Sequence, residues 1–310
     1  MEVHIKDSYI DERVDVVVSE ILKSKNLSRN IIQRHIKKGC TLNGQKCKRS
    51  HRLKSGDVLH LDDEYWDNLL KNIDLSDDIV AQEGKIDIRF ENENLIVLYK
   101  PKGLIVHPGV GNPKDILANY LRYYLEQKDE YDNLLDRAGI VHRLDKGVSG
   151  LMVTAKNKEA QEYLKKQFKE RSVIKIYRAK LEESTNIEQK IEIEKHIQQM
   201  NIEVEPWQEW QKIVGYIGRN LRDRYKMEFK RYQFSGSKEA LTYILFFDNE
   251  ALIKIETGRM HQIRATLAYL GYHIKGDKMY GKANEGDKIM LEAIVLSFKN
   301  MKGEQLTFKA

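Results

Sequence analysis

The sequence has very little cysteine and no long apolar run. Cys40 and Cys47 are the only two cysteines in 310 residues, and they do not form a Cys-x-x-Cys pair. Neither a disulfide framework nor a zinc site is therefore expected, and a reducing compartment fits. No apolar stretch is long enough to cross a bilayer, and the charged start, MEVHIKDSYIDERVD, lacks the apolar core of a signal peptide. We expect a cytoplasmic protein without a membrane partner.

Several catalytic motifs are also missing. In GVSGL (147–151) the last glycine is misplaced for a serine-hydrolase elbow, and in HRLD a leucine separates the arginine and aspartate of the kinase HRD. GVGNPK, from Gly109, has a lysine where a GxGxxG loop needs glycine, and no Walker lysine follows. His142 and Asp145 have no further convergent ligands nearby, so a metal site is not expected either.

Basic charge is concentrated in one part of the chain. The net charge is +6, but the segment from Arg13 to Lys54 has twelve lysines and arginines against two acidic residues, Asp15 and Glu20, and so carries +10. A small, strongly basic unit attached to a slightly acidic body is typical of nucleic-acid binding. A solvated basic surface without such a partner is the plainer alternative.

The basic segment is predicted to form two short helices followed by a hairpin. In SEILKSKNLSRNIIQRHIKKG, Ser28 is a candidate N-cap, apolar residues recur at helical spacing, and Gly39 ends the second helix. Asn43-Gly44 is a strong hairpin signal. Over about residues 13–61 this arrangement resembles the S4 domain, a small RNA-binding module. The candidate RNA-binding side chains are Arg29, Arg34, Lys37, Lys38, Lys48, Arg49 and Arg52.

An acidic tract follows the basic segment. Asp62 to Asp78 holds seven acidic residues and one lysine, which is typical of a boundary between domains. We therefore predict three parts: an S4-like RNA-binding domain over residues 1–62, an acidic linker over 63–85 and a larger domain over 86–310.

The larger part is predicted to be α+β. Strand patterns joined by hairpin signals, such as Asp248-Asn249, outnumber simple βαβ alternation. Amphipathic helices are expected in DILANYLRYYL, KEAQEYLKKQFKER and GRMHQIRATLAYLG. These features predict a mixed, mostly antiparallel sheet flanked by helices. The charged stretch from Leu181 to Trp210 is expected to be a surface insertion.

The stretch GIVHRLDKGVSGLMVTAKN (139–157) places charged residues between two apolar runs. Asp145 stands on a glycine-bounded loop at a strand end, two residues after Arg143. Because charged residues are seldom buried without a partner, this pattern indicates a functional carboxylate. The residues also leave a structural role open, in which Asp145 caps a turn and pairs with Arg143.

Four ordered blocks resemble the RluA-type pseudouridine synthases. GIVHRLDKGVSGL is similar to the family motif HRLDxxTSGL, YKPKGLIVHPGVGN to the first strand pair, and FKERSVIKIYRA to the segment with the active-site tyrosine. IETGRMHQIRATLAYLGYHIKGDKMYG is similar to the TGRxHQIR block and its GDxxYG tail. The resemblance implies that residues 86–310 are the catalytic domain of an isomerase. This enzyme would convert uridine in RNA to pseudouridine without a cofactor.

The resemblance also implies roles for single residues. Asp145 matches the nucleophile, Tyr177 the tyrosine that stacks on the target base, and Arg264 the arginine that pairs with the carboxylate. Arg143 matches the arginine that fills the gap left by the flipped base, and Leu291 an apolar residue of the base pocket. An ionised carboxylate in a site that excludes water needs such a cationic partner, because burial disfavours the charged form.

Taken without the family, some of these residues have plainer interpretations. Tyr177 lies on a strand with alternating apolar and polar residues, where a core residue is the first interpretation. Arg264 would be interpreted as a surface or helix-capping arginine. His107, His261 and Gln262 are expected to support loops rather than to react.

The sequence departs from the family pattern at Val148, which replaces a threonine, and at Glu292, where many relatives have histidine. GLIVHPGVGNP, GIVHRLDK and IGRNLRDRYKM are most similar to the RluD branch, which modifies large-subunit ribosomal RNA; the RluC branch, acting elsewhere on that RNA, is the alternative. We expect ribosomal RNA or a pre-ribosomal particle as the partner, and neither a metal nor a small-molecule cofactor. A catalytically silent RNA-binding factor in ribosome assembly is the competing hypothesis.

Overall fold

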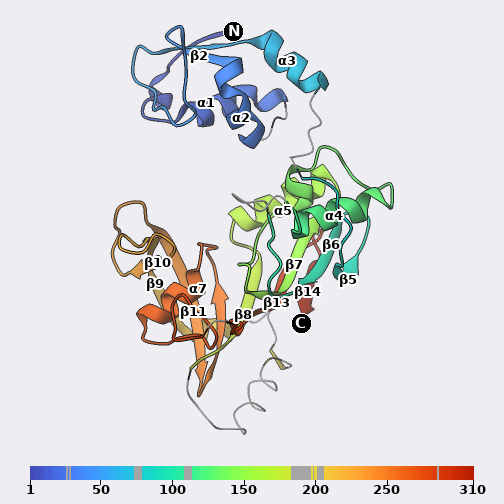
Figure 1. Ribbon diagram of the computed structural model, residues 1–310, viewed down its shortest axis with the longest axis vertical. Coiled ribbons are helices and arrows are strands. Elements are labelled where there is room, and N and C mark those ends of the chain that lie inside the picture. Colours follow the sequence, from blue (N-terminus) through green and yellow to red (C-terminus); the bar gives the residue numbers. More distant parts are fainter. Residues whose placement is uncertain are drawn as a thin grey trace. The chain divides into compact units, whose positions relative to one another are not determined.

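The chain forms two compact units (Figure 1). The computed structural model describes residues 1–25, 27, 29–72, 79–107, 114–182, 197, 199–200, 206–284 and 286–310, so the predicted N-cap Ser28 lies outside it. One unit consists of Met1–Asp78 with Asn133–Arg137, and the other of Ile79–Asp132 with Ala138–Ala310. None of the described helices is long and apolar enough to span a membrane.

The N-terminal unit combines a small antiparallel sheet with helices. The strand order is β1-β4-β2-β3, and Asn43 and Gly44, both with positive φ, form the predicted turn between β2 and β3. The elements are β1 (Glu2–His4), a 3-10 helix (Asp7–Tyr9), α1 (Val14–Ile21), a 3-10 helix (Leu22–Lys25), α2 (Arg29–Gly39), β2 (Cys40–Leu42), β3 (Gln45–Lys46), β4 (Val58–Leu61) and α3 (Asp63–Asn72).

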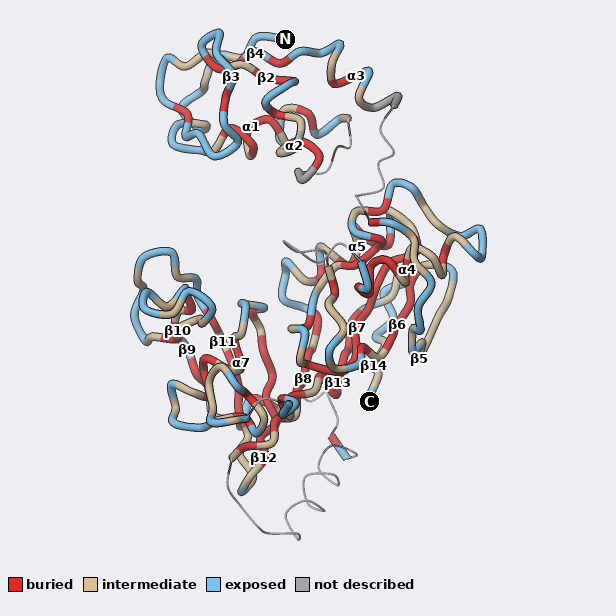
Figure 2. The backbone as a smooth tube through the Cα atoms, in the orientation of Figure 1, coloured by how far each residue is buried: buried red, intermediate tan, exposed pale blue. Residues whose placement is uncertain are grey.

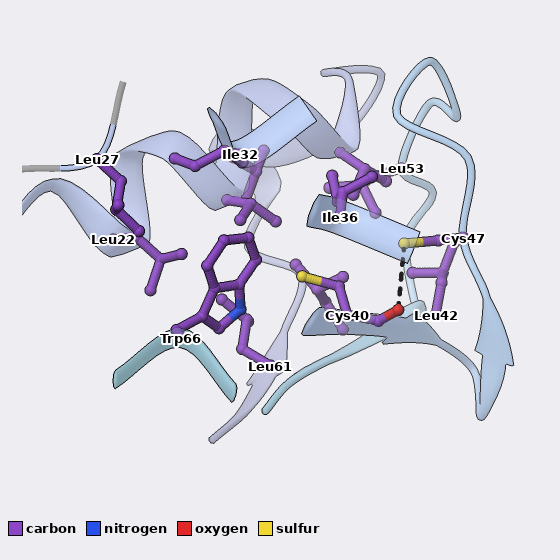
Figure 3. Packing of buried hydrophobic residues seen from close by; sticks show 14 of the residues in the cluster. Leu22, Leu27, Ile32, Ile36, Cys40, Leu42, Cys47, Leu53, Leu61 and Trp66 are labelled. Atoms are coloured by element: carbon purple, nitrogen blue, oxygen red, sulfur yellow. Dashed lines mark hydrogen bonds between the residues drawn. The ribbon is translucent and has the colours of Figure 1, made fainter. Parts of the chain in front are cut away.

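Apolar side chains from the helices and the sheet form the core of this unit (Figure 3). Ile32 and Ile36, from the apolar stripe predicted for α2, are buried against Leu61 of the sheet and Trp66 of α3. Burial of such side chains stabilises the unit by roughly 1.5–3 kcal/mol each. The N-terminal unit therefore has a hydrophobic core of its own.

The prediction of an acidic linker over residues 63–85 is wrong for the first part of this range. Asp63–Asn72 form α3, whose Trp66 is fully buried and donates from Nε1 to the Gly39 carbonyl at 2.9 Å. Acidic residues are favourable in the first turn of a helix because they face its positive end. The carboxylates of this tract thus suit a helix start, and Trp66 anchors the helix to the core.

The end of the predicted linker packs on the larger unit. Ile79 is buried, and its carbonyl accepts a hydrogen bond from Arg122 at 2.8 Å. The Val80 carbonyl accepts one from the Asn119 side chain at 2.6 Å. Residues 73–78 lie outside the described part. The acidic composition therefore marks a boundary, but it extends over residues that belong to the two units.

The larger unit is built on one ten-stranded sheet (Figure 1). The order is β10-β9-β11-β12-β8-β13-β7-β6-β5, with β14 on β13, and among the described strands only β13 and β7 pair in parallel. The prediction of a mixed, mostly antiparallel sheet is confirmed. The strands are β5 (Asp87–Glu91), β6 (Leu95–Lys100), β7 (Ser149–Ala155), β8 (Ile174–Lys180), β9 (Gln211–Arg219), β10 (Met227–Lys230), β11 (Lys238–Phe247), β12 (Glu250–Ile255), β13 (Leu291–Lys299) and β14 (Gln305–Lys309).

Three helices lie where the amphipathic patterns predict them: α4 (Leu117–Glu126), α5 (Lys158–Lys169) and α7 (Gln262–Tyr269). The side chain of Asn157 caps α5 by accepting from the Ala160 N–H at 2.9 Å. Helix α5 packs on β7, and α7 packs on β9, β10 and β11. The chain also has 3-10 helices at Asp136–Gly139 and Pro206–Glu209. Most of the predicted insertion Leu181–Trp210 lies outside the described residues.

The central strands bring distant parts of the sequence into one row. Ala293 of β13 pairs with Gly150 of β7 on one side and with Tyr177 of β8 on the other. Strand β7 is buried along its whole length, and most of β13 is buried as well (Figure 2). Gly150 has a φ of 126°, and a Cβ there would lie 2.3 Å from the Ala293 carbonyl oxygen. Only glycine fits this crossing, which therefore fixes the loop before β7 relative to Tyr177.

Candidate active site

Asp145 lies in a tight turn directly before β7. The Val148 N–H donates to the Asp145 carbonyl at 3.0 Å and closes the turn. The carbonyl of Lys146 accepts from the Gly103 N–H at 2.8 Å and from Lys100 Nζ at 3.4 Å. The backbone of the loop is thus held on both sides, while the Asp145 side chain stays 24% exposed. A reacting molecule can therefore reach this carboxylate.

Lys100 adds a buried positive charge to this loop. Its ammonium donates to the carbonyls of Pro101 at 2.9 Å and Leu104 at 2.8 Å, and its side chain is fully buried. Burial lowers the pKa of Lys100 to about 8, and the negative charge of Asp145 opposes this shift. At neutral pH Lys100 is still mostly protonated, so it adds a positive charge near Asp145.

Arg264, on α7, connects Asp145 to a second carboxylate. Its Nη1 lies 3.5 Å from Asp145 Oδ2. Its Nε and Nη2 each donate to one carboxylate oxygen of Asp277, both at 2.8 Å. Asp277 is buried and also accepts from the N–H groups of Met279 at 2.9 Å and Tyr280 at 3.2 Å. The guanidinium is therefore held in a fixed orientation by a two-pronged ion pair.

The charges of this pair stabilise each other. Burial opposes the charged form of Arg264, but its hydrogen bonds and proximity to Asp277 raise its pKa above the ordinary value. Burial likewise works against ionised Asp277, yet the hydrogen bonds and charge of Arg264 lower its pKa. The ion pair consequently keeps a permanent positive charge at the edge of the Asp145 site. The predicted pairing of Arg264 with the Asp145 carboxylate agrees with this geometry.

Tyr177 is buried in the middle of β8. Burial raises the pKa of its phenol most strongly, and the negative charge of Asp145 raises it further. The phenol is therefore protonated at neutral pH, and it can donate a hydrogen bond but is a poor proton acceptor. From the sequence alone, Tyr177 could be simply a core residue. In the structure it is buried, and it is also close enough to Asp145 for the carboxylate charge to affect its pKa.

Three further side chains contribute to the site: the sequence analysis did not name Asp277 and Tyr280, and it expected His261 only to support a loop. Asp277 orients Arg264, and the Tyr280 ring lies beneath the Arg264 guanidinium, 5.0 Å from ring centre to Cζ. His261 Nε2 lies 3.9 Å from Asp145 Oδ2, and its Nδ1 lies 3.1 Å from the Tyr280 hydroxyl. All three stand in the TGRMHQIR and GDKMYG blocks. The blocks mark these segments as related, but nothing in their spacing shows which side chains meet.

The remaining candidates of the larger unit have separate surroundings. Arg143 is exposed on the loop before Asp145, and Leu291 is buried at the start of β13. Gln262 supports its loop as predicted, because its Oε1 accepts from Thr257 at 2.8 Å and from the Arg259 N–H at 3.0 Å.

The two positions that depart from the family pattern lie in different surroundings. Val148 is buried in the turn after Asp145. Glu292 accepts a hydrogen bond from the hydroxyl of Tyr99, on β6. Val148 therefore has a buried apolar side chain where the family pattern has the hydroxyl of threonine. Glu292 is held by a tyrosine from another strand of the same sheet.

The candidates of the N-terminal unit lie on its surface. Lys37 and Lys38 are exposed at the end of α2, and Lys48 and Arg49 are exposed after β3. Arg52 is exposed too, but its Nη1 lies 3.2 Å from a carboxylate oxygen of Asp11. The side chains of Arg29 and Arg34, on α2, lie outside the described part. These cations belong to the N-terminal unit, whereas the residues around Asp145 belong to the larger unit.

Over the described ranges, no group of three or more histidine, cysteine, aspartate or glutamate side chains is arranged to hold a metal ion.

Comparison with known proteins gives consistent results. The family model described as RNA pseudouridylate synthase matches residues 94–269. "Ribosomal large subunit pseudouridine synthase D" of Xylella fastidiosa is 31% identical and covers 97% of this chain and 81% of its own length. An "Uncharacterized RNA pseudouridine synthase" of Chlorobaculum parvum is 32% identical over 89% of this chain and 75% of its own.

A solved structure shares the fold. The human protein "RNA Pseudouridylate Synthase Domain Containing 1" aligns with a TM-score of 0.52 at 23% identity, covering 74% of this chain and 85% of that one. At this identity the likeness concerns the fold, and it agrees with the predicted α+β class.

Proposed function

The chain belongs to the RNA pseudouridylate synthase family, and we propose that it modifies large-subunit ribosomal RNA with Asp145 as the nucleophile. As an RNA pseudouridine synthase it is an isomerase: the N1–C1′ bond of a uridine breaks, the uracil turns, and C5 joins C1′. The observation that carries the proposed site is the accessible Asp145 carboxylate, held 3.5 Å from a fixed guanidinium. Tyr177 lies close enough to sense its charge.

Each side chain of the site has a distinct task in this proposal. Asp145 supplies the ionised carboxylate, and Arg264, oriented by Asp277, stabilises its charge. Tyr177 stacks on the flipped uracil, and Leu291 lines the base pocket. Arg143, exposed beside Asp145, enters the gap that the base leaves. Base flipping costs a few kcal/mol of unstacking, and these contacts offset that cost.

Replacing Tyr177 separates stacking from hydrogen bonding. Tyr177→Phe keeps the ring and removes a protonated hydroxyl that could donate a hydrogen bond to a charged group during the reaction. A hydrogen bond to a charged group contributes about 1.5–3 kcal/mol, so turnover should fall roughly ten- to hundredfold while RNA affinity stays unchanged. Tyr177→Ala also loses stacking, worth about 1–3 kcal/mol per base, and should bind more weakly. Single-turnover rates and RNA titrations measure both effects. An alanine variant that binds and reacts normally would assign Tyr177 to the core alone.

The substrate proposal is supported by relatives and by resemblance. The Xylella fastidiosa relative is named for the ribosomal large subunit, and blocks such as IGRNLRDRYKM are most similar to the RluD branch. We place the reaction in the cytoplasm, on ribosomal RNA or on a pre-ribosomal particle. Modification at the positions used by the RluC branch, or a silent role in ribosome assembly, are the alternatives.

The N-terminal unit is proposed to be an S4-like RNA anchor. It has its own core and exposed cations on α2 and after β3, and its basic segment carries +10. Lysine and arginine on such a surface neutralise phosphates and release counterions. The unit then holds the RNA while the larger unit performs the reaction.

Salt dependence tests this anchor. Each neutralised phosphate contributes a slope of about −0.7 to −0.9 in log affinity against log salt concentration. Replacing Arg34, Lys37 and Lys38 by glutamine in the full chain should flatten this slope. It should also raise the apparent KM, with a smaller loss in single-turnover rate at saturating RNA. Deleting residues 1–78 should flatten the slope further. Equal slopes for the three proteins would show that these cations are a solvated surface.

Mapping pseudouridines in cells tests the function as a whole. Ribosomal RNA from cells that lack this protein should be missing specific pseudouridines of the large subunit. The wild-type gene should restore them, whereas a gene carrying Asp145→Asn should not. Loss at positions elsewhere in the same RNA would favour the RluC-like alternative, and an unchanged map would favour the silent assembly factor.

A further inference from the structure

His261 has an unusual backbone conformation at the edge of the active site. It precedes α7 with a φ of 54°, in the left-handed region that residues with a side chain seldom adopt. Such strain persists only where the surrounding structure holds it, and it is concentrated at functional sites. Here it directs a largely buried imidazole toward the carboxylate, with Nε2 3.9 Å from Asp145 Oδ2.

The Tyr280 hydroxyl determines which nitrogen of His261 carries the proton. This hydroxyl accepts from the Met227 N–H at 2.7 Å and donates to the Met227 carbonyl at 3.1 Å. A phenol has one hydrogen, and when this hydrogen is donated to the Met227 carbonyl, the hydroxyl accepts from His261 Nδ1 at 3.1 Å. In this arrangement Nδ1 carries the proton, and Nε2 presents a lone pair to Asp145.

The surroundings of His261 keep its imidazole neutral. Burial lowers its pKa, and Arg264 and Arg143 act in the same direction, whereas Asp145 and Asp277 oppose them. The result is a pKa below the ordinary value of 6.5, so Nε2 is free to accept a proton at pH 7. Tyr280, which also faces the ring, stays protonated because burial raises its pKa to about 12.

The other described groups that interact with Asp145 are mostly protonated at neutral pH. Tyr177 is a protonated phenol with a raised pKa. Lys100, with a pKa of about 8, is mostly an ammonium ion, and Arg264 is a guanidinium. The reaction nevertheless needs an acceptor, because the C5 hydrogen of uracil must leave as a proton once C5 has joined C1′.

We propose that His261 is the residue that takes this proton, by way of the Asp145 carboxylate. This step rests on the proposed function. The C5–H bond breaks, its electrons restore the C5=C6 double bond, and the electrons of the C6=N1 bond move onto N1. The proton passes from Asp145 Oδ2 to His261 Nε2, and N1 takes up one proton in exchange. No oxidant or cofactor is required. Because His261 acts through Asp145, it is a positioning residue.

A deuterium isotope effect at C5 distinguishes this role from a structural one. His261→Gln keeps a polar side chain but cannot accept the proton. A general base contributes on the order of 10²-fold or more, so the single-turnover rate should fall by about that factor with RNA affinity unchanged. RNA with deuterium at C5 of uridine should react more slowly than ordinary RNA in this variant, by a larger ratio than in the wild type. His273→Gln, at a half-buried histidine whose buried Nδ1 has no hydrogen-bond partner within the described chain, is the matched control and should match the wild type.

The pH profile gives a second readout. In the wild type, proton removal should slow as the pH falls through the pKa of His261, below 6.5, because the imidazole becomes protonated. His261→Gln should lack this dependence. Tyr280→Phe, which removes the acceptor of the Nδ1 proton, should show a smaller rate loss with the same enlarged isotope effect.

Two results would overturn the proposal. One is a wild-type rate in His261→Gln. The other is a slow variant with an unchanged isotope effect and a lowered Tm, which would show that His261 only supports its loop. Failure of the proposed function looks different, because the wild-type protein would then form no pseudouridine in any ribosomal RNA.

Discussion

The Asp145→Asn variant is expected to bind RNA as the wild type does and to form no measurable pseudouridine. Asparagine keeps the size of the side chain and can still accept hydrogen bonds, but it lacks the ionised oxygen of the proposed nucleophile. Removing a nucleophile typically costs on the order of 10⁴-fold or more in turnover. Because the turn is closed by backbone contacts, the loop should stay folded. Single-turnover rates at saturating RNA and RNA titrations measure the two effects.

The control for this variant is Asp129→Asn, on an exposed turn of the same unit. It removes the same charge without touching the site and should react like the wild type. A rate for Asp145→Asn within tenfold of the wild type would remove Asp145 from the role of nucleophile and return it to the role of a turn-capping residue.

The second large effect is expected from Arg264→Met, which should reduce both turnover and stability. The substitution leaves Asp277 buried without its cation, and breaking a buried ion pair in this way costs about 3–5 kcal/mol. It also removes the positive charge 3.5 Å from Asp145. Arg264→Lys should retain part of the activity, because lysine keeps the charge but cannot bond both oxygens of Asp277. Urea unfolding and single-turnover rates separate the two losses.

Adding Asp277→Asn to Arg264→Met tests the origin of the stability loss. The second substitution removes the uncompensated charge, so it should recover much of the stability without restoring turnover. If the double variant were no more stable than Arg264→Met, the cause would be lost packing and not the buried carboxylate.

The contribution of Asp277 to the pH dependence of stability should have opposite signs in the wild type and in Arg264→Met. In the wild type the folded-state pKa of Asp277 is below its ordinary value of 3.8. Its contribution is therefore present above pH 3.8 and is lost as the pH falls through the lower, folded-state value. In Arg264→Met, burial without a cation should raise the folded-state pKa. The destabilisation measured at pH 7 should then shrink as the pH falls toward 4.

The sequence predicts the parts of this site that are written as contiguous blocks. HRLD and its flanking glycines point to Asp145 because a charged loop at the end of an apolar strand is unusual, and the resemblance adds Tyr177 and Arg264. The sheet type also follows from local signals, since hairpin turns such as Asn43-Gly44 depend on only a few residues. The turn and the mostly antiparallel sheet both occur in the structure.

Contacts between distant segments are what the sequence does not predict. Asp277 is close to Arg264 in space because the chain after α7 folds back, and no local pattern specifies that return. The meeting of His261 with Asp145 has the same origin. The linker prediction was wrong for a related reason: composition describes the average of a segment, whereas a single buried side chain, Trp66, decides where α3 packs.

Direct detection of pseudouridine tests the central claim. Purified wild-type protein is incubated with a large-subunit ribosomal RNA transcript, and the digested nucleosides are identified by chromatography and mass spectrometry. Pseudouridine should form with the wild type and not with Asp145→Asn, although both proteins bind the RNA. The account would be contradicted if both proteins bound the RNA and neither formed pseudouridine in it, whether the RNA was a naked transcript or part of a pre-ribosomal particle.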